Sequence, residues 1–277
     1  MHNTEQAKMG LTTIGLAGVG RMGRGMLANM LKAGIEVAGF DIRPESDFPG
    51  LPVTSDADRF AERLETLFTV VRDADQTDEV LFGTQGFVTR AKKLKTVVIC
   101  STLSPNYVRE LRARVPDHIA LVDAPMSGAQ VGAREATLAF MIGGAETDVA
   151  ALIPMFQAMG TNIHHMGGFG DGMQSKVLNN LLCSSHTAMA RLVLDWADKT
   201  GVDRQKLLNL IETATGQNWF TSRFDQIEFS RHGFEPDNTI GILVKDVTCA
   251  LDAAPEGADT SLPEVVREAM RDLKPIA

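Results

Sequence analysis

Three features are scarce in this chain of 277 residues: cysteine, long apolar runs and clusters of basic residues. The three cysteines, Cys100, Cys183 and Cys249, are far apart and form no Cys-x-x-Cys pair, which argues against a disulfide framework or a cysteine-bound metal. No spacing of His, Cys, Asp and Glu suggests a metal site. No apolar run approaches the roughly 18 residues that a membrane-spanning helix needs.

The balance of charge excludes a further class of protein. The 35 acidic residues outnumber the 27 basic ones and give a net charge of −8, which argues against nucleic acid as the main partner. Residues 1–8 are polar and lack the apolar core of a signal peptide, so we expect a disordered lead-in there. The unpaired cysteines fit a reducing cytosol, so we expect a cytoplasmic protein. An acidic chain that binds an anionic ligand has to do so through local geometry.

A glycine-rich segment near the start offers such geometry. The segment reads Gly18-Val19-Gly20-Arg21-Met22-Gly23. It follows a strand-like run at 14–17 and opens a helix-like run at 22–32, as in a βαβ unit that binds a dinucleotide. There, Gly18 allows the tight turn, Gly20 lets the backbone approach a pyrophosphate, and Gly23 lets helix and strand pack closely. The helix N-terminus then offers N–H groups to the phosphates. The alternative is a structural glycine turn in another α/β protein.

An acidic residue bears on the choice of cofactor. A second strand-like run at 35–40 is followed by Asp41, 23 positions after Gly18. A carboxylate there can accept hydrogen bonds from both ribose hydroxyls of adenosine and repels a 2′-phosphate, which favours NAD. Arg43 argues the other way, because an arginine two residues on could hold that phosphate. The sequence predicts NAD, with NADP as the alternative.

The first half of the chain alternates between strand-like and helix-like patterns. The expected strands are residues 12–17, 36–40, 66–71, 96–100, 120–123, 138–142 and 162–165. The expected helices are residues 22–32, 57–63, 77–81, 105–114 and 147–159. Asp56 and Ser104 are expected N-caps. This alternation predicts an α/β fold with a doubly wound, mostly parallel Rossmann sheet.

The character of the sequence changes after the glycine-rich residues 167–172. No convincing strand follows, and the helical patterns are residues 174–200, 204–214, 219–230 and 242–254. We therefore expect a Rossmann domain at residues 1–172 and an all-α domain at residues 173–277, entered through a long helix.

The start of that long helix holds the strongest candidate for chemistry. Residues 177–190 read VLNNLLCSSHTAMA, without Asp, Glu, Lys or Arg, and a helix without a charged face is normally buried on most sides. Lys176 precedes this run and shares a face with Asn180, one turn on, and with Ser184 and Thr187. Burial should lower the pKa of such a lysine, as a general base for an alcohol proton requires. The alternative is a lysine whose amine reaches solvent at a helix end.

Two other strand ends are followed by polar residues. The Ser127 hydroxyl and the N–H groups of Gly128 and Ala129 could form a neutral anion pocket suited to a carboxylate. A structural turn of this Gly/Ala-rich segment, ending near Gly132, is an equal alternative. Thr102 follows another expected strand and is a candidate cofactor contact.

Five segments in order resemble the β-hydroxyacid dehydrogenase family, which includes 3-hydroxyisobutyrate dehydrogenase and tartronate semialdehyde reductase. The segments are IGLAGVGRMGRGMLANMLKAG, CSTLSP, DAPMSGA, GFGDGMQSKVLNN and KDVTCAL. The likeness covers residues 12–251. It implies Lys176 as the catalytic lysine and Asn180 as its hydrogen-bonding neighbour.

The resemblance implies the remaining roles as well. Ser127 and Gly128 would hold the substrate carboxylate, Thr102 and Lys245 would contact the cofactor, and Asp246 would help to order the site. The expected reaction is reversible hydride transfer between NAD and C3 of a short 3-hydroxy acid. A homodimer or homotetramer with the long helix at its interface is also implied.

The chain departs from the family pattern at three places. Ala129-Gln130 replaces a more glycine-rich pattern, and Val71-Arg72-Asp73 replaces a Leu-Pro-like loop. Pro255 and Gly257 interrupt the helical pattern near the end, so we expect the last helix of the family to be missing. Imine reductases share the architecture but usually lack a lysine at the position of Lys176. An imine-reductase-like enzyme and a non-catalytic dinucleotide-binding regulator are the alternatives.

Overall fold

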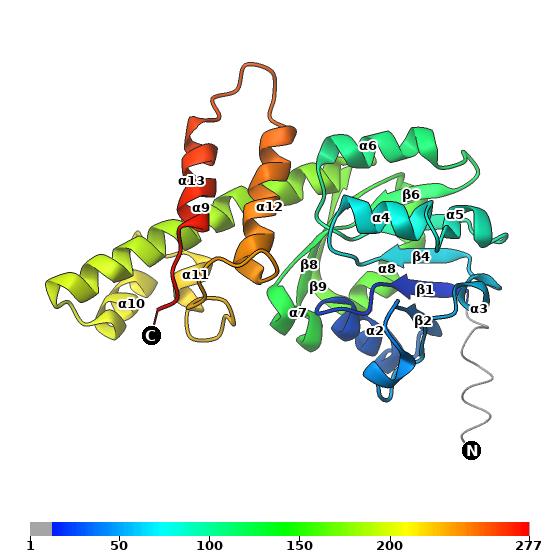
Figure 1. Cartoon of the computed structure of the whole chain (residues 1–277), viewed down its shortest axis with the longest axis horizontal. Helices are drawn as coiled ribbons and strands as arrows, with labels where there is room; N and C mark the ends of the chain where they lie inside the picture. The colour runs from blue at the N-terminus through cyan, green and yellow to red at the C-terminus, as the bar shows by residue number, and fades with distance from the viewer. Residues whose placement is uncertain (1–12, 277) are drawn as a thin grey trace. The chain divides into compact units, whose positions relative to one another are not determined.

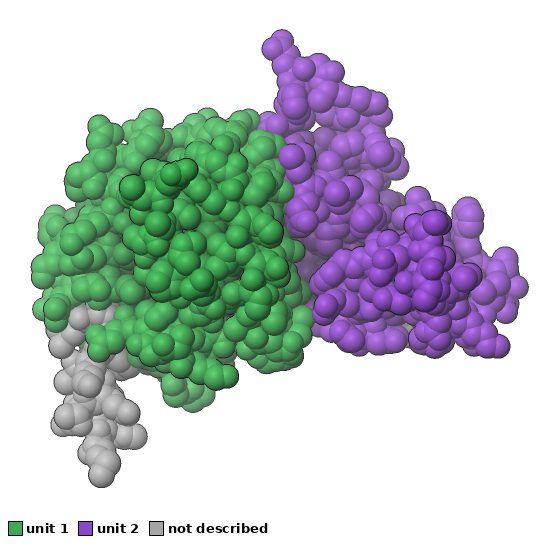
Figure 2. Space-filling model, turned by 180° about the vertical axis from the view of Figure 1, so that it is seen from behind, with its two compact units in different colours: residues 1–176 green, residues 177–277 purple. Residues whose placement is uncertain are grey.

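The computed structural model describes residues 13–276, and the chain divides into two compact units, Met1–Lys176 and Val177–Ala277 (Figure 1 and Figure 2). The expected lead-in at residues 1–8, and Thr12 of the first expected strand, lie outside the described residues. Helix α9 (Asp171–Thr200) begins in the first unit and continues in the second. Within residues 13–276, no helix combines the length and apolar character needed to cross a bilayer.

Among the described residues, the first unit forms a nine-stranded sheet in the order β3-β2-β1-β4-β5-β6-β8-β7, with β9 paired to β8. The parallel part comprises β1 (Ile14–Ala17), β2 (Val37–Phe40), β3 (Val53–Thr54), β4 (Thr66–Thr69), β5 (Thr96–Ile99) and β6 (Ala120–Asp123). β7 (Met126–Ser127) and β8 (Leu138–Gly143) are antiparallel, whereas β9 (Gly160–Gly167) runs parallel to β8. The strand order reverses at β1 and β4, where a doubly wound sheet binds its ligand. The predicted fold class is confirmed.

Helices cover both faces of this sheet (Figure 1). One face carries α2 (Gly23–Lys32), α7 (Ala129–Glu135) and α8 (Glu146–Met159). The other carries α3 (Ala57–Ala61), α4 (Ala74–Leu81), α5 (Phe87–Arg90) and α6 (Pro105–Arg114). Neighbouring residues of β1 show the alternation, since Leu16 belongs to the first apolar cluster and Ala17 to the second. Burial on both sides explains why these strands are almost uniformly apolar.

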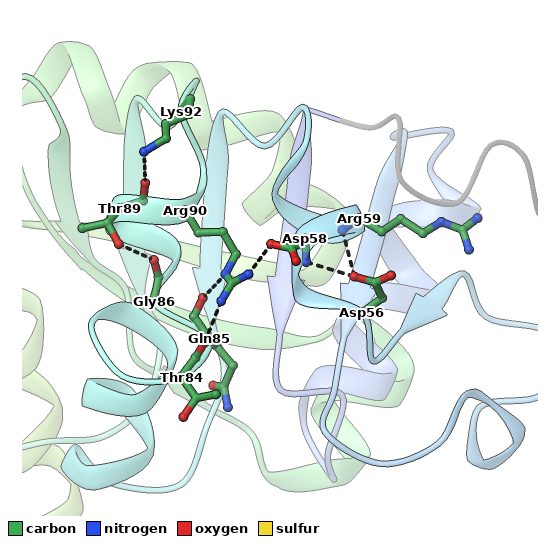
Figure 3. A network of polar contacts seen from close by, with 9 residues as sticks. All are labelled: Asp56, Asp58, Arg59, Thr84, Gln85, Gly86, Thr89, Arg90 and Lys92. Atoms are coloured by element: carbon green, nitrogen blue, oxygen red, sulfur yellow. Dashed lines mark hydrogen bonds and ion pairs between the residues drawn. The ribbon is translucent and has the colours of Figure 1, made fainter.

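Local hydrogen bonds fix the helices on the second face (Figure 3). The Asp56 carboxylate accepts from the N–H groups of residues 58 and 59 at the start of α3, each at 3.0 Å. Arg90 of α5 pairs with Asp58 and donates to the carbonyl oxygens of Gln85 and Thr84 at 2.8 and 2.9 Å. Both predicted caps are confirmed, because Ser104 likewise accepts from the Asn106 N–H at the start of α6.

In the part of the second unit that the structure describes, the regular elements are helices. After α9 come α10 (Arg204–Thr213), α11 (Trp219–Ser222), α12 (Thr239–Asp252) and α13 (Ser261–Arg271). Its core gathers aromatic and aliphatic side chains, among them Phe220, Phe224, Phe229, Ile240 and Met270. Arg191 of α9 is buried and donates to the carbonyl oxygens of Ser230 at 2.9 Å, His232 at 2.7 Å, and Lys274.

Three local expectations were wrong. Residues 129–135 form helix α7 rather than a turn ending near Gly132, and the helix expected at 219–230 is limited to α11. A helix, α13, follows the break at Pro255 and Gly257 although no last helix was expected there. Pro263 lies in its first turn, where a helix tolerates a proline because no intrahelical N–H bond is lost.

Candidate active site

The three motif glycines are required for different reasons. Gly18 has a φ of +96°, and a Cβ there would lie 2.4 Å from the Val70 carbonyl oxygen. A Cβ on Gly23 would lie 2.0 Å from the Gly18 carbonyl oxygen, so the turn and α2 cannot come this close with a side chain between them. A Cβ on Gly20 would meet nothing within 4 Å. The fold therefore does not need a glycine at position 20, but a pyrophosphate approaching the backbone does.

The N-terminus of α2 suits an anion. Met22 occupies the N-cap position, and within residues 13–276 no side chain caps the helix and no acidic residue lies in its first turn. Arg21 is exposed beside this turn, and Val19 is buried beneath it. The backbone N–H groups and the positive end of the helix dipole can therefore face a phosphate.

Asp41 lies just beyond the end of β2 and is already engaged by four donors. Its Oδ2 accepts from the Val19 N–H at 2.9 Å and from Arg43 Nη2 at 3.0 Å. Its Oδ1 accepts from the Arg43 backbone N–H at 3.1 Å and from Arg43 Nε at 2.9 Å. A carboxylate has about four acceptor sites, so a ribose diol would have to displace part of this set. Burial alone would raise the pKa of Asp41, but the hydrogen bonds and charge of Arg43 outweigh it and lower the pKa.

Replacing Arg43 with alanine should change the preference between the two dinucleotides. The change frees acceptor sites on Asp41, so NADH should bind roughly 2- to 10-fold more tightly, the equivalent of one net hydrogen bond. NADPH should bind more weakly, because the unpaired carboxylate would repel the 2′-phosphate. Fluorescence titration with both cofactors measures this, with the exposed Arg63→Ala as control. If the affinities for NADH and NADPH both fell by the same factor, the role of Arg43 would instead be to hold the segment after β2 in place.

Other candidate residues follow the carboxyl ends of neighbouring parallel strands. Thr102 is half-buried after β5, next to Ser101, whose Oγ accepts from the Val71 N–H at 3.1 Å. Ser127 is half-buried in β7 and leads into Gly128, with a φ of +135°, and Ala129, with a φ of +55°. An alanine in the left-handed region costs about 1–2 kcal/mol, and such strain is typical of ligand sites.

Asp123 at the end of β6 is the first residue of the segment DAPMSGA, but the sequence analysis gave it no role. Its carboxylate is buried and accepts from the Gly170 N–H at 2.6 Å and the Met173 N–H at 2.5 Å. Burial raises the pKa of Asp123 to about 6, although the two backbone hydrogen bonds act in the opposite direction. An acidic residue at the end of a parallel strand was the only sequence signal for this contact.

Lys176 lies on α9, one turn after Met173, and its side chain is 6% exposed. The predicted polar face of the helix is buried along its length, including Asn180, Ser184 and Thr187. Within a single chain, α9 is not buried on most sides as its sequence predicted, since Leu178 is 54% exposed. The buried side of α9 carries these polar residues together with apolar ones such as Val177 and Leu194, while the large apolar side chains of the other side are exposed.

Three further candidates meet within the second unit. Asn180 Nδ2 donates to Asp246 Oδ2 at 2.6 Å, and Lys245 Nζ lies 2.7 Å from Asp246 Oδ1. Asp246 is buried on α12, so it fixes the Asn180 amide and pairs with the ammonium group of Lys245. Within residues 13–276, no group of three or more His, Cys, Asp or Glu side chains could hold a metal ion.

A parallel sheet with its switch point at β1 and β4, an α2 N-terminus without a side-chain cap and an open Gly20 are the features of a Rossmann domain that binds a dinucleotide. Residues 13–168 match the NAD binding domain of 6-phosphogluconate dehydrogenase, and residues 170–275 match the NAD-binding family of NADP-dependent 3-hydroxyisobutyrate dehydrogenase. The chain belongs to the β-hydroxyacid dehydrogenase family, as its sequence motifs predicted.

Individual relatives agree with this assignment. The chain is 32% identical over 257 residues to 2-hydroxy-3-oxopropionate reductase of Escherichia coli, covering 89% of this chain and 84% of that protein. It is 28% identical over 254 residues to mitochondrial 3-hydroxyisobutyrate dehydrogenase of Mus musculus, covering 88% and 76%. A solved structure of Mycobacterium tuberculosis 3-hydroxyisobutyrate dehydrogenase with L-serine has a TM-score of 0.78 at 28% identity, covering 95% of this chain and 96% of that one. The predicted enzyme class and NAD(P) cofactor are confirmed.

Proposed function

We propose that this enzyme transfers a hydride reversibly between NAD and the C3 hydroxyl of a short 3-hydroxy acid, with Lys176 as general acid and base. The observation that carries the proposal is the burial of Lys176 on α9, where only 6% of the residue is exposed. Lysines are rarely buried to this extent, so a buried lysine that shares a helix face with Asn180 is a candidate for chemistry rather than a surface residue.

Most of the proposed cofactor contacts belong to the first unit. The glycine turn at Gly18, Gly20 and Gly23 offers room and N–H groups for the pyrophosphate, and Asp41 would receive the adenosine ribose. Thr102 and Lys245 are proposed as further cofactor contacts. When bound, NAD supplies the acceptor for the hydride.

The substrate would be oriented by polar groups at its two ends. Ser127 and the N–H groups of Gly128 and Ala129 are proposed to bind the carboxylate. Asn180, whose amide is fixed by Asp246, would orient the C3 hydroxyl. In oxidation, the amine of Lys176 takes the hydroxyl proton while the C3–H bond breaks with its electron pair and the C=O bond forms. In reduction, Lys176 returns that proton. Acid–base catalysis of this kind contributes about 10²–10⁴-fold in rate.

The names of the relatives support a small hydroxy acid or its semialdehyde as substrate. They are a 2-hydroxy-3-oxopropionate reductase, a 3-hydroxyisobutyrate dehydrogenase and, at 30% identity over 249 residues, an L-threonate dehydrogenase of Cupriavidus necator. Each name places a hydroxyl or carbonyl group on a short acid, which the proposed carboxylate pocket would accommodate.

A substrate panel tests the proposal directly. We expect NADH to appear, by absorbance, when NAD is mixed with the enzyme and one of 3-hydroxyisobutyrate, glycerate or threonate. The same panel with NADP compares the two cofactors. Tight NADH binding without turnover of any acid would reject the proposal and favour a non-catalytic dinucleotide-binding regulator.

A homo-oligomer is also proposed, on the outer face of α9. Leu178, Leu182, Met189 and Trp196 are between 54% and 62% exposed and recur at helical spacing along one face. A row of large exposed apolar side chains is typical of an association surface. Light scattering should give a mass of two or four chains, and a monomer at micromolar concentration would contradict the proposal.

A further inference from the structure

The buried carboxylate of Asp123 holds the beginning of the helix that carries Lys176. Most helices are capped by the residue just before their first turn, whereas here the cap comes from β6, 47 and 50 positions earlier than its two donors. The donors, the N–H groups of Gly170 and Met173, lie just before and within the first turn of α9. A negative charge at this end also interacts favourably with the helix dipole.

Two glycines make room for this contact. A Cβ on Gly143 of β8 would lie 2.3 Å from Asp123 Oδ1, and a Cβ on Gly172 of α9 would lie 2.9 Å from Asp123 Oδ2. A Cβ on Gly172 would also lie 2.4 Å from the Met141 carbonyl oxygen, so the helix start is seated directly on the backbone of β8. The carboxylate, the sheet edge and the helix start therefore fit together without room for another side chain.

We propose that Asp123 is a positioning residue for Lys176, fixing the first turn of α9 and with it the direction of the amine. This inference rests on the proposed function for the role of the lysine, but the positioning itself is a property of the first unit. Met173 and Lys176 are three residues apart on one helix, so a shift of the first turn moves the amine as well. Displacement of a reacting group by about 1 Å can cost roughly 10²-fold in rate.

Among the described residues, Asp171 is the charged group that acts on the pKa of Asp123. Asp171 on α9 raises the pKa of Asp123 slightly further, and it lies 3.7 Å from Arg109 of α6 in an ion pair. Cys100, after β5, stays a neutral thiol because its burial and the charge of Asp123 both raise its pKa. Lys176 is the ionisable residue of the following turn.

The direction of the pH effect follows from these surroundings. The pKa of Asp123, about 6, is above the ordinary range of an aspartate, so its contribution to folding stability is greatest at low pH and is lost as pH rises through 6. Ionised Asp123 thus lowers stability at neutral pH, which is typical of a group kept for function. Below pH 6 the carboxyl gains a proton, and the oxygen that carries it becomes a much weaker acceptor for a backbone N–H.

Magnetic resonance tests the contact without relying on activity. In protein labelled with ¹⁵N at glycine and methionine, the Gly170 and Met173 amide signals should shift with a common midpoint near pH 6. This wild-type titration needs no variant, so it stands even if Asp123→Asn does not fold. The absence of any shift in both amides across the whole pH range in which the protein stays folded would overturn the capping role.

The effect on the lysine needs a second readout. With ¹³Cε-labelled lysine, the Lys176 signal, identified by its loss in Lys176→Arg, should move in Asp123→Asn but not in the matched Asp171→Asn. The Asp171 side chain is 49% exposed and belongs to the same helix start. An unmoved Lys176 signal in Asp123→Asn would overturn the proposal, whatever the substrate panel shows.

Kinetics then separate positioning from binding. In the reduction direction, where Lys176 donates its proton, kcat of the wild type should fall below pH 6 as Asp123 becomes protonated. Asp123→Asn should lower kcat at least 10-fold, leave KM for NADH within about threefold, and show no such fall between pH 5 and 7. A wild-type pH profile retained by Asp123→Asn would refute the link, whereas absent turnover in the wild type would refute only the proposed function.

Discussion

Lys176→Met is expected to lower kcat for hydroxy-acid oxidation by about 10²–10⁴-fold, because a positioned general base contributes that much to proton transfer. Methionine has a similar length and no charge, so it can fill the buried position of a side chain that is only 6% exposed. The melting temperature and the NADH dissociation constant should therefore stay near those of the wild type. Stopped-flow kinetics, differential scanning calorimetry and fluorescence titration measure the three quantities.

The matched control lies at the far end of the same helix. Lys199 is exposed and pairs with Asp195 at 2.6 Å, so Lys199→Met should leave kcat unchanged. Near-normal turnover of Lys176→Met would remove the lysine from the mechanism. Joint loss of turnover, NADH binding and thermal stability would assign it a structural role instead.

Gly20→Ala is expected to weaken NADH binding without destabilising the protein. The new methyl group meets no protein atom within 4 Å, and φ at position 20 lies outside the left-handed region. It would occupy space that the pyrophosphate needs, and overfilling a fitted site costs about 1–3 kcal/mol, or roughly 5- to 150-fold in Kd. Calorimetry should show an unchanged melting temperature, while titration shows the loss of affinity.

Substitutions at two other glycines serve as controls for Gly20→Ala. Gly23→Ala places a methyl group against the Gly18 carbonyl oxygen and should lower the melting temperature, since backbone cannot move aside cheaply. Gly216→Ala, whose nearest neighbour is 3.9 Å away, should alter neither property. If Gly20→Ala binds NADH as tightly as the wild type, the pyrophosphate does not approach the backbone at this turn.

Elements governed by local patterning could be predicted from the sequence. The strand at 120–123 and the helix at 105–114 have the predicted bounds, because an apolar run ends at Asp123 and Ser104-Pro105 starts a helix. The glycine turn and the helix face shared by Lys176 and Asn180 could also be predicted, because each depends on residues only a few positions apart in the sequence.

The remaining features depend on partners far away in the chain. The Asp123 contact joins residues 47 and 50 positions apart, and Asn180 meets Asp246 across 66 positions. Spacing along a helix shows that α9 has a polar and an apolar side, but it does not show which of them turns inward. The left-handed start of α7 at Ala129 likewise runs against the ordinary preference of alanine.

The exposed apolar row of α9 and the buried polar residues on its other side are under separate selection. A change such as Leu182→Glu on the outer side would be nearly silent in a lone chain and would be felt only where copies associate. A change on the inner side, among Asn180, Ser184 and Thr187, would affect the structure of every copy. The residues on one side of α9 would thus be constrained by assembly, and those on the other side by the chemistry of each chain.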